Sequence, residues 1–194
     1  MKRFENWRTV ATRLPEARLG NWRVVRRTGS FVRPYWFGDT EALVIGDLTY
    51  LYEGETEWMA DDPARVEVMR RYANQAWDSV LVGGLGLGLL VEELRKNPRV
   101  KNVLIVEEST HVIDMVWPEV KGRAALTEDD FWETASRRGD WDVIIADLWD
   151  DHAQHDLLME EVRARARKVR DAHPHARVIL HGFPELSDYD PLRE

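Results

Sequence analysis

Acidic side chains follow three apolar segments of the sequence, each at the point where a buried strand would end. Glu107 follows residues 103–106, Asp129 and Asp130 follow a weaker strand pattern, and Asp147 follows residues 141–146. Carboxylates at such positions can accept hydrogen bonds from ribose hydroxyls or take a proton from an attacking nucleophile. The spacing therefore predicts a site for a nucleotide-type ligand, with a general base available beside it.

A glycine-rich segment precedes the first of these acids. Gly84, Gly86 and Gly88 alternate with leucines directly after an apolar strand pattern. Without Cβ atoms a backbone can turn tightly, approach a ligand closely and pack against the next helix. Glu107 lies about 20 residues further on, where units that bind adenosine place the acid for the ribose. Tight packing of a helix against a strand would also select glycine, but residues 79–108 together favour an adenosine-type ligand.

These residues need a scaffold in which strands alternate with helices. Apolar runs predict five strands that end near residues 82, 106, 126, 146 and 180, and capped helical patterns lie between them. The fold class is therefore α/β, with a short, Rossmann-like, doubly wound and mostly parallel sheet. The last strand, Val178 to Leu180, would leave an exposed edge, which we expect the N-terminal hairpins or a second subunit to cover.

Residues 1–60 have a different pattern, with turn residues between β-branched and aromatic runs. They predict a small antiparallel sheet or hairpins with strands at 21–27, 41–45 and 48–52, and turns at 28–29, 37–39 and 46–47. We therefore divide the chain into an N-terminal β-hairpin and oligomerisation region, 1–60, and a ligand-binding Rossmann-like domain, 61–194.

Composition excludes several classes of protein. The 194 residues contain no cysteine, which removes disulfides, thiolate zinc sites and cysteine nucleophiles. No apolar run reaches 18 residues and no secretory signal is evident, so we expect no membrane span and a cytoplasmic location. The net charge of −8 disfavours general affinity for nucleic acid, although residues 1–33 carry nine Lys or Arg against two Glu. That basic arm could contact RNA or an acidic neighbouring subunit, or could simply be solvated.

In order and spacing, the strand, the GxGxG turn, the strand-end Glu107, Glu-Asp-Asp and Asp-x-x-Asp resemble the class I S-adenosylmethionine-dependent methyltransferase fold. Within that fold the sequence is most similar to the polyamine aminopropyltransferases, the spermidine-synthase-like branch, over about residues 40 to 182. The resemblance implies a transferase that binds S-adenosylmethionine, its decarboxylated form or a methylthioadenosine-type ligand. It also agrees with a homo-oligomer, which we expect to be a dimer.

The resemblance implies roles for the residues of the donor site. The three alternating glycines correspond to the donor-binding loop, and Glu107 corresponds to the acid that holds the ribose. Asp129, with Asp130 and Phe131 after it, resembles the segment whose acid faces the adenine amino group. No metal ligand is assigned.

Asp147 and Asp150 resemble the Asp-x-x-Asp in which the first acid takes a proton from an attacking amine. Two neighbouring carboxylates suit a base that works near neutral pH, but the pair could instead cap a loop and the following helix. Trp149 between them could stack on an acceptor, line the sulfonium pocket by cation–π attraction, or cover the helix behind it. Trp58 and Met59 could cover the donor, although apolar packing is the simpler explanation.

The sequence also departs from the aminopropyltransferase pattern. The glycine turn contains no acid to hold an aminopropyl amine, and Arg65 and Val66 stand where tyrosine and histidine are usual. Three alternatives therefore stay open: aminopropyl transfer to a polyamine, a catalytically silent protein that binds an adenosyl ligand, and a nicotinamide dinucleotide enzyme that uses the same turn.

His152 and His155, with the aspartates around them, form a cluster that could hold magnesium, manganese or zinc. A polar helix start explains the same residues without an ion, and the cluster matches no established metal pattern.

Overall fold

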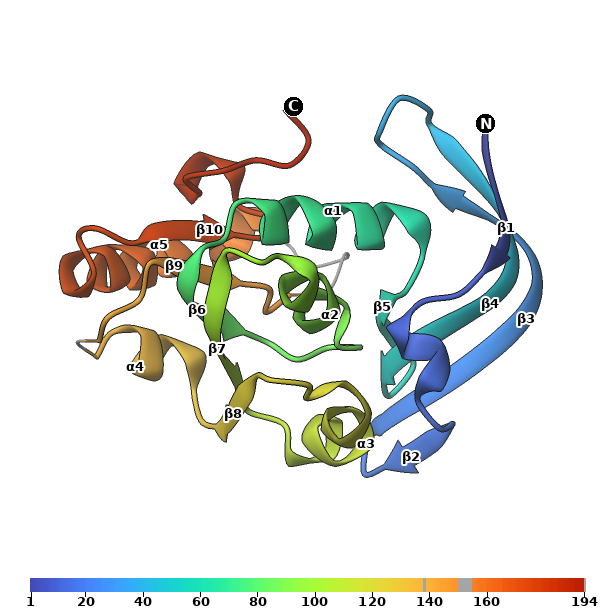
Figure 1. The fold of residues 1–194 in the computed structure, drawn as a ribbon, viewed down its shortest axis with the longest axis horizontal. Helices are drawn as coiled ribbons and strands as arrows, with labels where there is room; N and C mark the ends of the chain where they lie inside the picture. The colour runs from blue at the N-terminus through green and yellow to red at the C-terminus, as the bar shows by residue number, and fades with distance from the viewer. Residues whose placement is uncertain (138, 150–154, 194) are drawn as a thin grey trace.

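The computed structural model describes residues 1–137, 139–149 and 155–193, with side chains omitted at 155–157. Two β-sheets lie side by side, one built from the N-terminal third of the chain and one from the remainder (Figure 1). The N-terminal sheet contains β1 (Lys2–Trp7), β2 (Ala17–Leu19), β3 (Trp22–Pro34), β4 (Glu41–Glu53) and β5 (Thr56–Ala60). The second sheet contains β6 (Asp78–Gly83), β7 (Val100–Glu107), β8 (Ala125–Glu128), β9 (Val143–Ala146) and β10 (Arg177–Leu180).

The second sheet has the architecture that the sequence predicts. Its five strands run in the order β10-β9-β6-β7-β8, and every neighbouring pair is parallel. The order reverses beside β6, which is the topological switch point where open α/β sheets bind their ligands. The predicted Rossmann-like, doubly wound sheet is confirmed, and the carboxyl ends of its strands meet at one edge.

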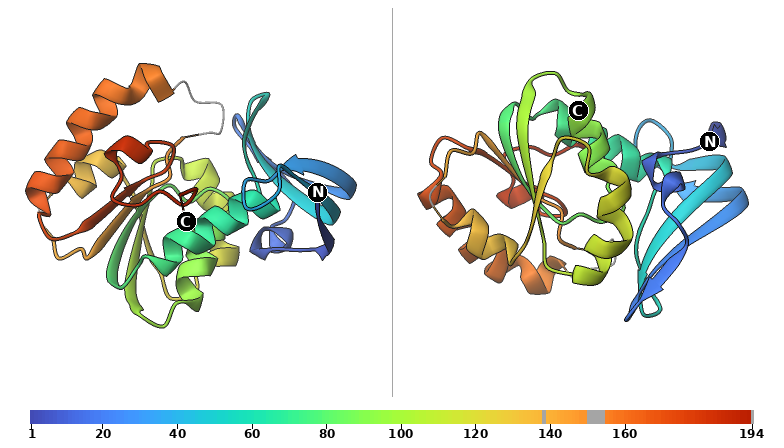
Figure 2. Two further views of the ribbon diagram at one scale, coloured as in Figure 1. Left: turned by 90° about the horizontal axis from the view of Figure 1, so that it is seen from above. Right: turned by 60° about the horizontal axis from the view of Figure 1, so that its bottom comes forward.

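Helices cover both faces of this sheet, because successive apolar side chains of its buried strands point to opposite faces and both faces have to be buried. Val80 and Val82 face a layer of α1 (Pro63–Asn74), α2 (Leu89–Lys96) and α3 (Thr110–Val120). Leu81, between them, faces α4 (Phe131–Ala135) and α5 (His155–Ala172) on the other side. Figure 2 shows these two helical layers on opposite faces of the sheet. None of the helices within the described ranges is long and apolar enough to cross a bilayer.

Side-chain caps fix where the helices begin. Asp62 caps α1, Ser109 caps α3 and Asp130 caps α4, each by accepting a hydrogen bond from a backbone N–H of the first turn. Helix α3 ends at Val120 and contains Pro118 in its last turn. A proline near the end of a helix removes one backbone donor, and in the last turn this does not stop the helix.

The N-terminal sheet consists of longer strands than the sequence predicted. The turn at residues 37–39 is present, but 28–29 and 46–47 are not turns: Thr28 pairs with Asp47 and Gly29 with Gly46 in the middle of the β3–β4 ladder. Gly46 has φ of 145°, and a Cβ there would lie 2.5 Å from the backbone nitrogen of Trp7 in β1. This glycine therefore serves the close approach of another strand, a use that sequence alone does not separate from a turn.

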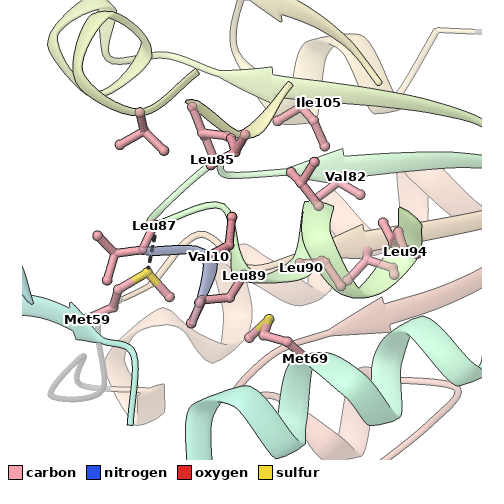
Figure 3. Close-up of a cluster of buried hydrophobic side chains, with 14 of the residues drawn as sticks. Val10, Met59, Met69, Val82, Leu85, Leu87, Leu89, Leu90, Leu94 and Ile105 are labelled. Atoms are coloured by element: carbon pink, nitrogen blue, oxygen red, sulfur yellow. Dashed lines mark hydrogen bonds between the residues drawn. The ribbon is translucent and has the colours of Figure 1, made fainter. Parts of the chain in front are cut away.

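One face of the N-terminal sheet packs against the α1, α2 and α3 layer. Val24, Leu51 and Met59 from β3, β4 and β5 belong to the same buried cluster as the leucines of α2 and the glycine turn. Figure 3 shows Met59 reaching the turn, where the Leu87 N–H donates to its sulfur at 3.1 Å. The N-terminal sheet is thereby fixed beside the turn that leads into α2.

The exposed edge of β10 is covered by the end of the chain itself. Asp188 accepts from the Val178 N–H at 2.7 Å and donates its own N–H to the Val178 carbonyl at 2.8 Å, while Ser187 accepts from the Leu180 N–H. Arg71 of α1 also donates to the carbonyl of Pro191. The expectation that the hairpins or a second subunit would cover this edge is therefore wrong, because the polar C-terminal segment supplies the missing partners (Figure 1).

Candidate functional site

A cleft of about 590 Å³ lies at the carboxyl ends of β6, β7, β8 and β9. On its far side it is bounded by Trp22 of β3, Leu51 and Glu53 of β4, and Trp58 of β5. The cleft therefore occupies the switch point of the parallel sheet and is closed from one side by the N-terminal sheet. Its volume lies in the range of pockets that bind small molecules and cofactors.

Glu107 ends β7 and is tied to the glycine turn. Its two carboxylate oxygens accept from the backbone N–H groups of Leu85 and Ser109 at 2.8 and 2.9 Å. Burial raises the pKa of Glu107, and these two donors oppose that shift. Each carboxylate oxygen still has a lone pair to offer, so the acid can hold the turn and accept from a ligand hydroxyl at once.

The predicted glycines divide into two groups. Gly84 and Gly86 line the cleft, with φ values of 88° and 50°. A Cβ on Gly84 would lie 2.3 Å from the carbonyl oxygen of Asp147, so this position requires glycine. Gly88 is not among the described residues that line the cleft. It begins α2 with φ of 75°, and a Cβ there would lie 2.7 Å from Val120, so Gly88 serves helix packing.

The leucines of the turn point away from the cleft. Leu85 and Leu87 are buried in the apolar cluster of Figure 3, at 4% and 0% exposure. Because no acid replaces either leucine, the turn offers the cleft its backbone alone. The adjoining walls have to supply any side chain that recognises a ligand.

Asp129 and Asp130 also line the cleft, but they are held differently. Asp130 caps α4 through the Glu133 N–H at 2.7 Å. Asp129 accepts from the Thr134 hydroxyl, the Asp130 N–H and Arg137, and these bonds, led by the hydroxyl, hold its pKa below the usual range. Asp129 is therefore an ionised, solvent-accessible acid at the end of the cleft next to β8.

Asp147 ends β9 at the other end of the cleft and faces two basic side chains. Its Oδ1 lies 3.4 Å from Arg65 Nη1 and 3.9 Å from His181 Nε2. Arg65 and Asp147 side chains are only 5% and 13% exposed. The predicted base is therefore present in the cleft, as one member of a largely buried charge network.

Aromatic rings line both sides of the cleft. Trp149 packs edge-on against Phe183 with centroids 4.6 Å apart and lies 6.2 Å from Trp132, yet it also lines the cleft. Trp149 therefore packs against the fold and also lines the cleft. Opposite, Trp22 and Trp58 form a T-shaped pair at 5.2 Å.

The charge of the cleft is strongly negative. Among the described residues its lining includes one guanidinium, that of Arg165, which pairs with Glu161 at 2.7 Å. The lining carboxylates number seven: Glu53, Glu107, Glu108, Asp129, Asp130, Asp147 and Glu161. Such a lining attracts a cation and disfavours a ligand with several phosphates.

Several predicted residues fall outside the described part of the chain. Asp150 and His152 lie in the undescribed segment, and the side chain of His155 is not described either. The second acid of Asp-x-x-Asp therefore stays a prediction, and the histidine cluster that could hold a metal ion is not tested. Within the described ranges no group of three or more His, Asp or Glu side chains is placed to hold a metal ion.

Sequence reasoning missed Arg65 as a partner of Asp147, whereas His181 could be expected near the cleft as a strand-end residue. Arg65 is 82 residues away in the chain and Arg65 was noted only as a departure from a motif. His181 follows β10 and joins the same network. The usable indication was positional, since His181 directly follows the end of a parallel strand next to β9, where side chains converge.

Comparison with known proteins gives fold neighbours only. No protein-family model and no curated protein matches the chain. A spermidine synthase structure from Thermotoga maritima has 18% identity and a TM-score of 0.48, covering 66% of this chain and 46% of its own. A precorrin 8w decarboxylase structure from Methanobacterium thermoautotrophicum has 18% identity and a TM-score of 0.42, covering 60% and 61%.

A glycopeptide N-methyltransferase complexed with S-adenosylmethionine has 17% identity and a TM-score of 0.42, covering 59% of this chain and 53% of its own. The neighbours thus include methyltransferases and a spermidine synthase. The chain spans about half the length of the spermidine synthase. At these scores the likeness assigns no activity, and a function has to be argued from the residues of this chain.

Proposed function

We propose that the chain binds an adenosyl sulfonium donor, S-adenosylmethionine or a close analogue, and transfers a group from it to an acceptor. One observation carries the proposal: acids that end three different parallel strands line a single cleft together with Gly84 and Gly86. Convergence at the switch point is what this fold uses to bind nucleotides. The excess of carboxylates then favours a cationic nucleoside over a phosphorylated one.

In this proposal the Glu107 end of the cleft holds the nucleoside. Glu107 accepts from the ribose hydroxyls while it keeps its bonds to Leu85 and Ser109. Asp129, the half-buried and ionised acid beside β8, is suited to the amino group of the adenine ring. The rings of Trp22 and Trp58 lie on the opposite side and exclude water from the bound nucleoside.

The Asp147 end is where transfer would take place. A sulfonium donor is already activated, so the protein has to align the nucleophile and remove its proton. The nucleophile forms a bond to the transferred carbon, the carbon–sulfur bond breaks with its electrons on sulfur, and Asp147 receives the proton. Trp149 lines this end and can attract the sulfonium through its ring face.

Calorimetric titration of the whole chain tests the donor proposal. We expect binding of S-adenosylmethionine and S-adenosylhomocysteine, and much weaker binding of NAD, whose two phosphates meet the acidic lining. Glu119→Gln removes an exposed acid of α3 that lies outside the cleft lining and serves as the matched control. Failure of S-adenosylmethionine, its decarboxylated form, S-adenosylhomocysteine and methylthioadenosine to bind would end the proposal, whereas tight NAD binding without them would favour a dinucleotide enzyme.

A second candidate is a protein that binds the adenosyl ligand without catalysing transfer. It is favoured by the contact of Asp147 with Arg65, which engages the proposed base in a charge network, and by the absence of an acid in the turn. Turnover that disappears in Asp147→Asn while donor affinity is retained would rule out this candidate. Aminopropyl transfer to a polyamine is the third option, and decarboxylated S-adenosylmethionine is the donor that tests it.

Three further predictions accompany the proposal. The division at residue 60, with an oligomerising N-terminal region, predicts a dimer in solution that light scattering would detect.

A cytoplasmic location is the prediction for a chain with this composition. The basic residues of the N-terminal region leave RNA binding as a weaker prediction, which a filter-binding assay at two salt concentrations would test.

A further inference from the structure

A second cavity, of about 270 Å³, lies between α1 and the C-terminal segment. We call it the tail cavity, because residues 180–192 supply most of its wall and Trp36 closes one side. Among the described residues, none lines both this cavity and the cleft. Its walls are largely apolar, formed by Val68, Leu180 and the two prolines of the segment, and its size suits a molecule of one or two rings.

A chain of polar contacts connects the tail cavity with Asp147. Arg65 and His181 both line the cavity, and Arg65 Nη1 lies 2.8 Å from His181 Nε2. His181 Nδ1 lies 3.0 Å from the hydroxyl of Tyr72, which lines the cavity as well. Since both Arg65 and His181 lie within 3.9 Å of Asp147 Oδ1, the polar end of the cavity is next to the proposed base.

Which group donates and which accepts in these contacts follows from the chemistry of the guanidinium and the imidazole. A guanidinium only donates, so His181 Nε2 accepts from Arg65 and the imidazole proton resides on Nδ1. Nδ1–H then donates to the Tyr72 oxygen, and the hydroxyl hydrogen of Tyr72 is left to donate elsewhere. Tyr72 is only 2% exposed, burial raises its pKa, and no acceptor for its hydrogen occurs among the described residues. A ligand in the cavity would supply that acceptor.

The charges of the tail cavity disfavour an ionic ligand. Its two acids are already paired, Asp62 with Arg33 at 3.1 Å and Asp190 with Arg193 at 3.1 Å. Arg65 opposes a cation such as a diamine. Arg65 itself faces Asp147 at 3.4 Å, so the charges around the cavity are balanced in pairs and an uncharged ligand is favoured.

We propose that the tail cavity binds a small, uncharged, ring-sized molecule with a hydroxyl group, and that this molecule is the acceptor of the transfer. The second part depends on the donor function proposed above. The ring would lie among Trp36, Tyr189 and Leu192, and its hydroxyl oxygen would accept from Tyr72. Transfer requires Arg65 and His181, which separate the cavity from Asp147, to move aside. The oxygen then attacks the carbon on the donor sulfonium, the carbon–sulfur electrons return to sulfur, and the hydroxyl proton passes to Asp147.

Fluorine NMR titration of the full chain with 4-fluorophenol tests the cavity without any donor. We expect saturable binding that weakens by at least about tenfold in Leu192→Trp, which fills the cavity from an exposed position. Tyr72→Phe removes the donor and should weaken binding by about fivefold to tenfold, the value of one hydrogen bond. Tyr50→Phe, at a buried tyrosine outside the cavity, is the matched control and should leave the affinity unchanged.

Absence of saturable binding to the wild-type chain, or equal affinity in Leu192→Trp, would overturn the site. If Tyr72→Phe fails to fold, Leu192→Trp still tests whether 4-fluorophenol binds in the tail cavity. Displacement of 4-fluorophenol by 1,4-diaminobutane or benzoate would overturn the uncharged ligand class.

Saturating S-adenosylhomocysteine separates the acceptor role from simple binding. We expect both ligands to bind together, whereas displacement of 4-fluorophenol would place both in one site and overturn the acceptor role. If no adenosyl ligand binds at all, the donor function fails while the phenol titration still judges the tail cavity by itself.

Discussion

Glu107 and Asp147 end two strands of one sheet and line one cleft, but different groups hold them. Glu107 accepts from two neutral backbone amides, those of Leu85 and Ser109, and these belong to the segments that shape the nucleoside end. Asp147 faces Arg65 and His181, which line the tail cavity. A carboxylate at equivalent strand-end positions therefore couples to the glycine turn at one end and to a buried charge network at the other.

The difference indicates a division of labour within the cleft. An acid fixed by backbone amides presents its remaining lone pairs in a constant direction, which suits recognition of a ribose. An acid that contacts basic side chains can exchange a proton or a partner during a reaction. We therefore expect substitutions at the two acids to separate donor affinity from turnover.

The largest effect is expected for turnover in Asp147→Asn. Loss of a general base reduces the rate by about a thousandfold, in the middle of the usual range for such groups. Donor affinity, measured by calorimetry, should change by less than about threefold, because Glu107 remains. Asp114→Asn, at an exposed position of α3, is the control. A loss of donor affinity as large as the loss of turnover would abolish the proposed division.

A third buried acid, Asp61, tests whether neutral donors alone keep a carboxylate ionised. It is fully buried, accepts from the Thr49 N–H and the Thr9 hydroxyl, and burial raises its pKa from 3.8 to about 6. Because the folded pKa is the higher one, the favourable contribution is complete below pH 3.8 and is lost as the pH rises through 6.

Asp61→Asn remains neutral throughout this range and keeps an oxygen for the Thr49 N–H. Between pH 4 and pH 7 its free energy of unfolding should therefore rise relative to wild type by up to about 3 kcal/mol, from the shift at 1.36 kcal/mol per unit. Urea denaturation across that range measures the change, with Asp39→Asn at the surface as control. Parallel pH curves for wild type and Asp61→Asn would show that the buried acid does not titrate as described.

Glu107→Gln should weaken donor binding by about 30-fold, or about 2 kcal/mol, because a charged acceptor for hydroxyls is replaced by a neutral amide. Glu108→Gln is the matched control, since Glu108 is the neighbouring acid of the cleft but is exposed. Calorimetry with S-adenosylhomocysteine measures both variants. Equal effects of the two substitutions would mean that overall negative charge, and not the position of Glu107, attracts the ligand.

The smallest effect on binding is expected for Gly88→Ala. The left-handed backbone and the contact with Val120 should cost about 1 to 2 kcal/mol of stability. Donor affinity should stay within about threefold of wild type, since Gly88 serves the packing of α2. A large loss of affinity in a folded Gly88→Ala variant would restore the role that the glycine pattern first suggested.

The strand-end acids could be predicted because a parallel sheet brings the carboxyl ends of its strands to one edge. Glu107, Asp129 and Asp147 needed only strand patterns and their order along the chain. Arg65 could not be placed, because its contact with Asp147 depends on how α1 packs across 82 residues of intervening sequence. Gly46 was misread for a related reason: the strand that requires it, β1, is distant in sequence.

The tail cavity shows the same limit. The segment after β10 has neither a strand pattern nor a helix pattern, although it carries the apolar residues Phe183, Leu186, Tyr189 and Leu192. The segment becomes a wall of the cavity because Asp188 and Ser187 pair with backbone groups of β10. No local sequence pattern predicts this pairing. Once that pairing is made, Tyr189 and Leu192 lie opposite α1 and enclose a cavity.

A crystal structure of the chain soaked with S-adenosylhomocysteine tests the division of the cleft most directly. We expect ribose hydroxyls within hydrogen-bond distance of Glu107 and the sulfur atom at the end of the cleft lined by Asp147 and Trp149. A nucleoside bound in the reverse direction, or outside the cleft, would contradict it.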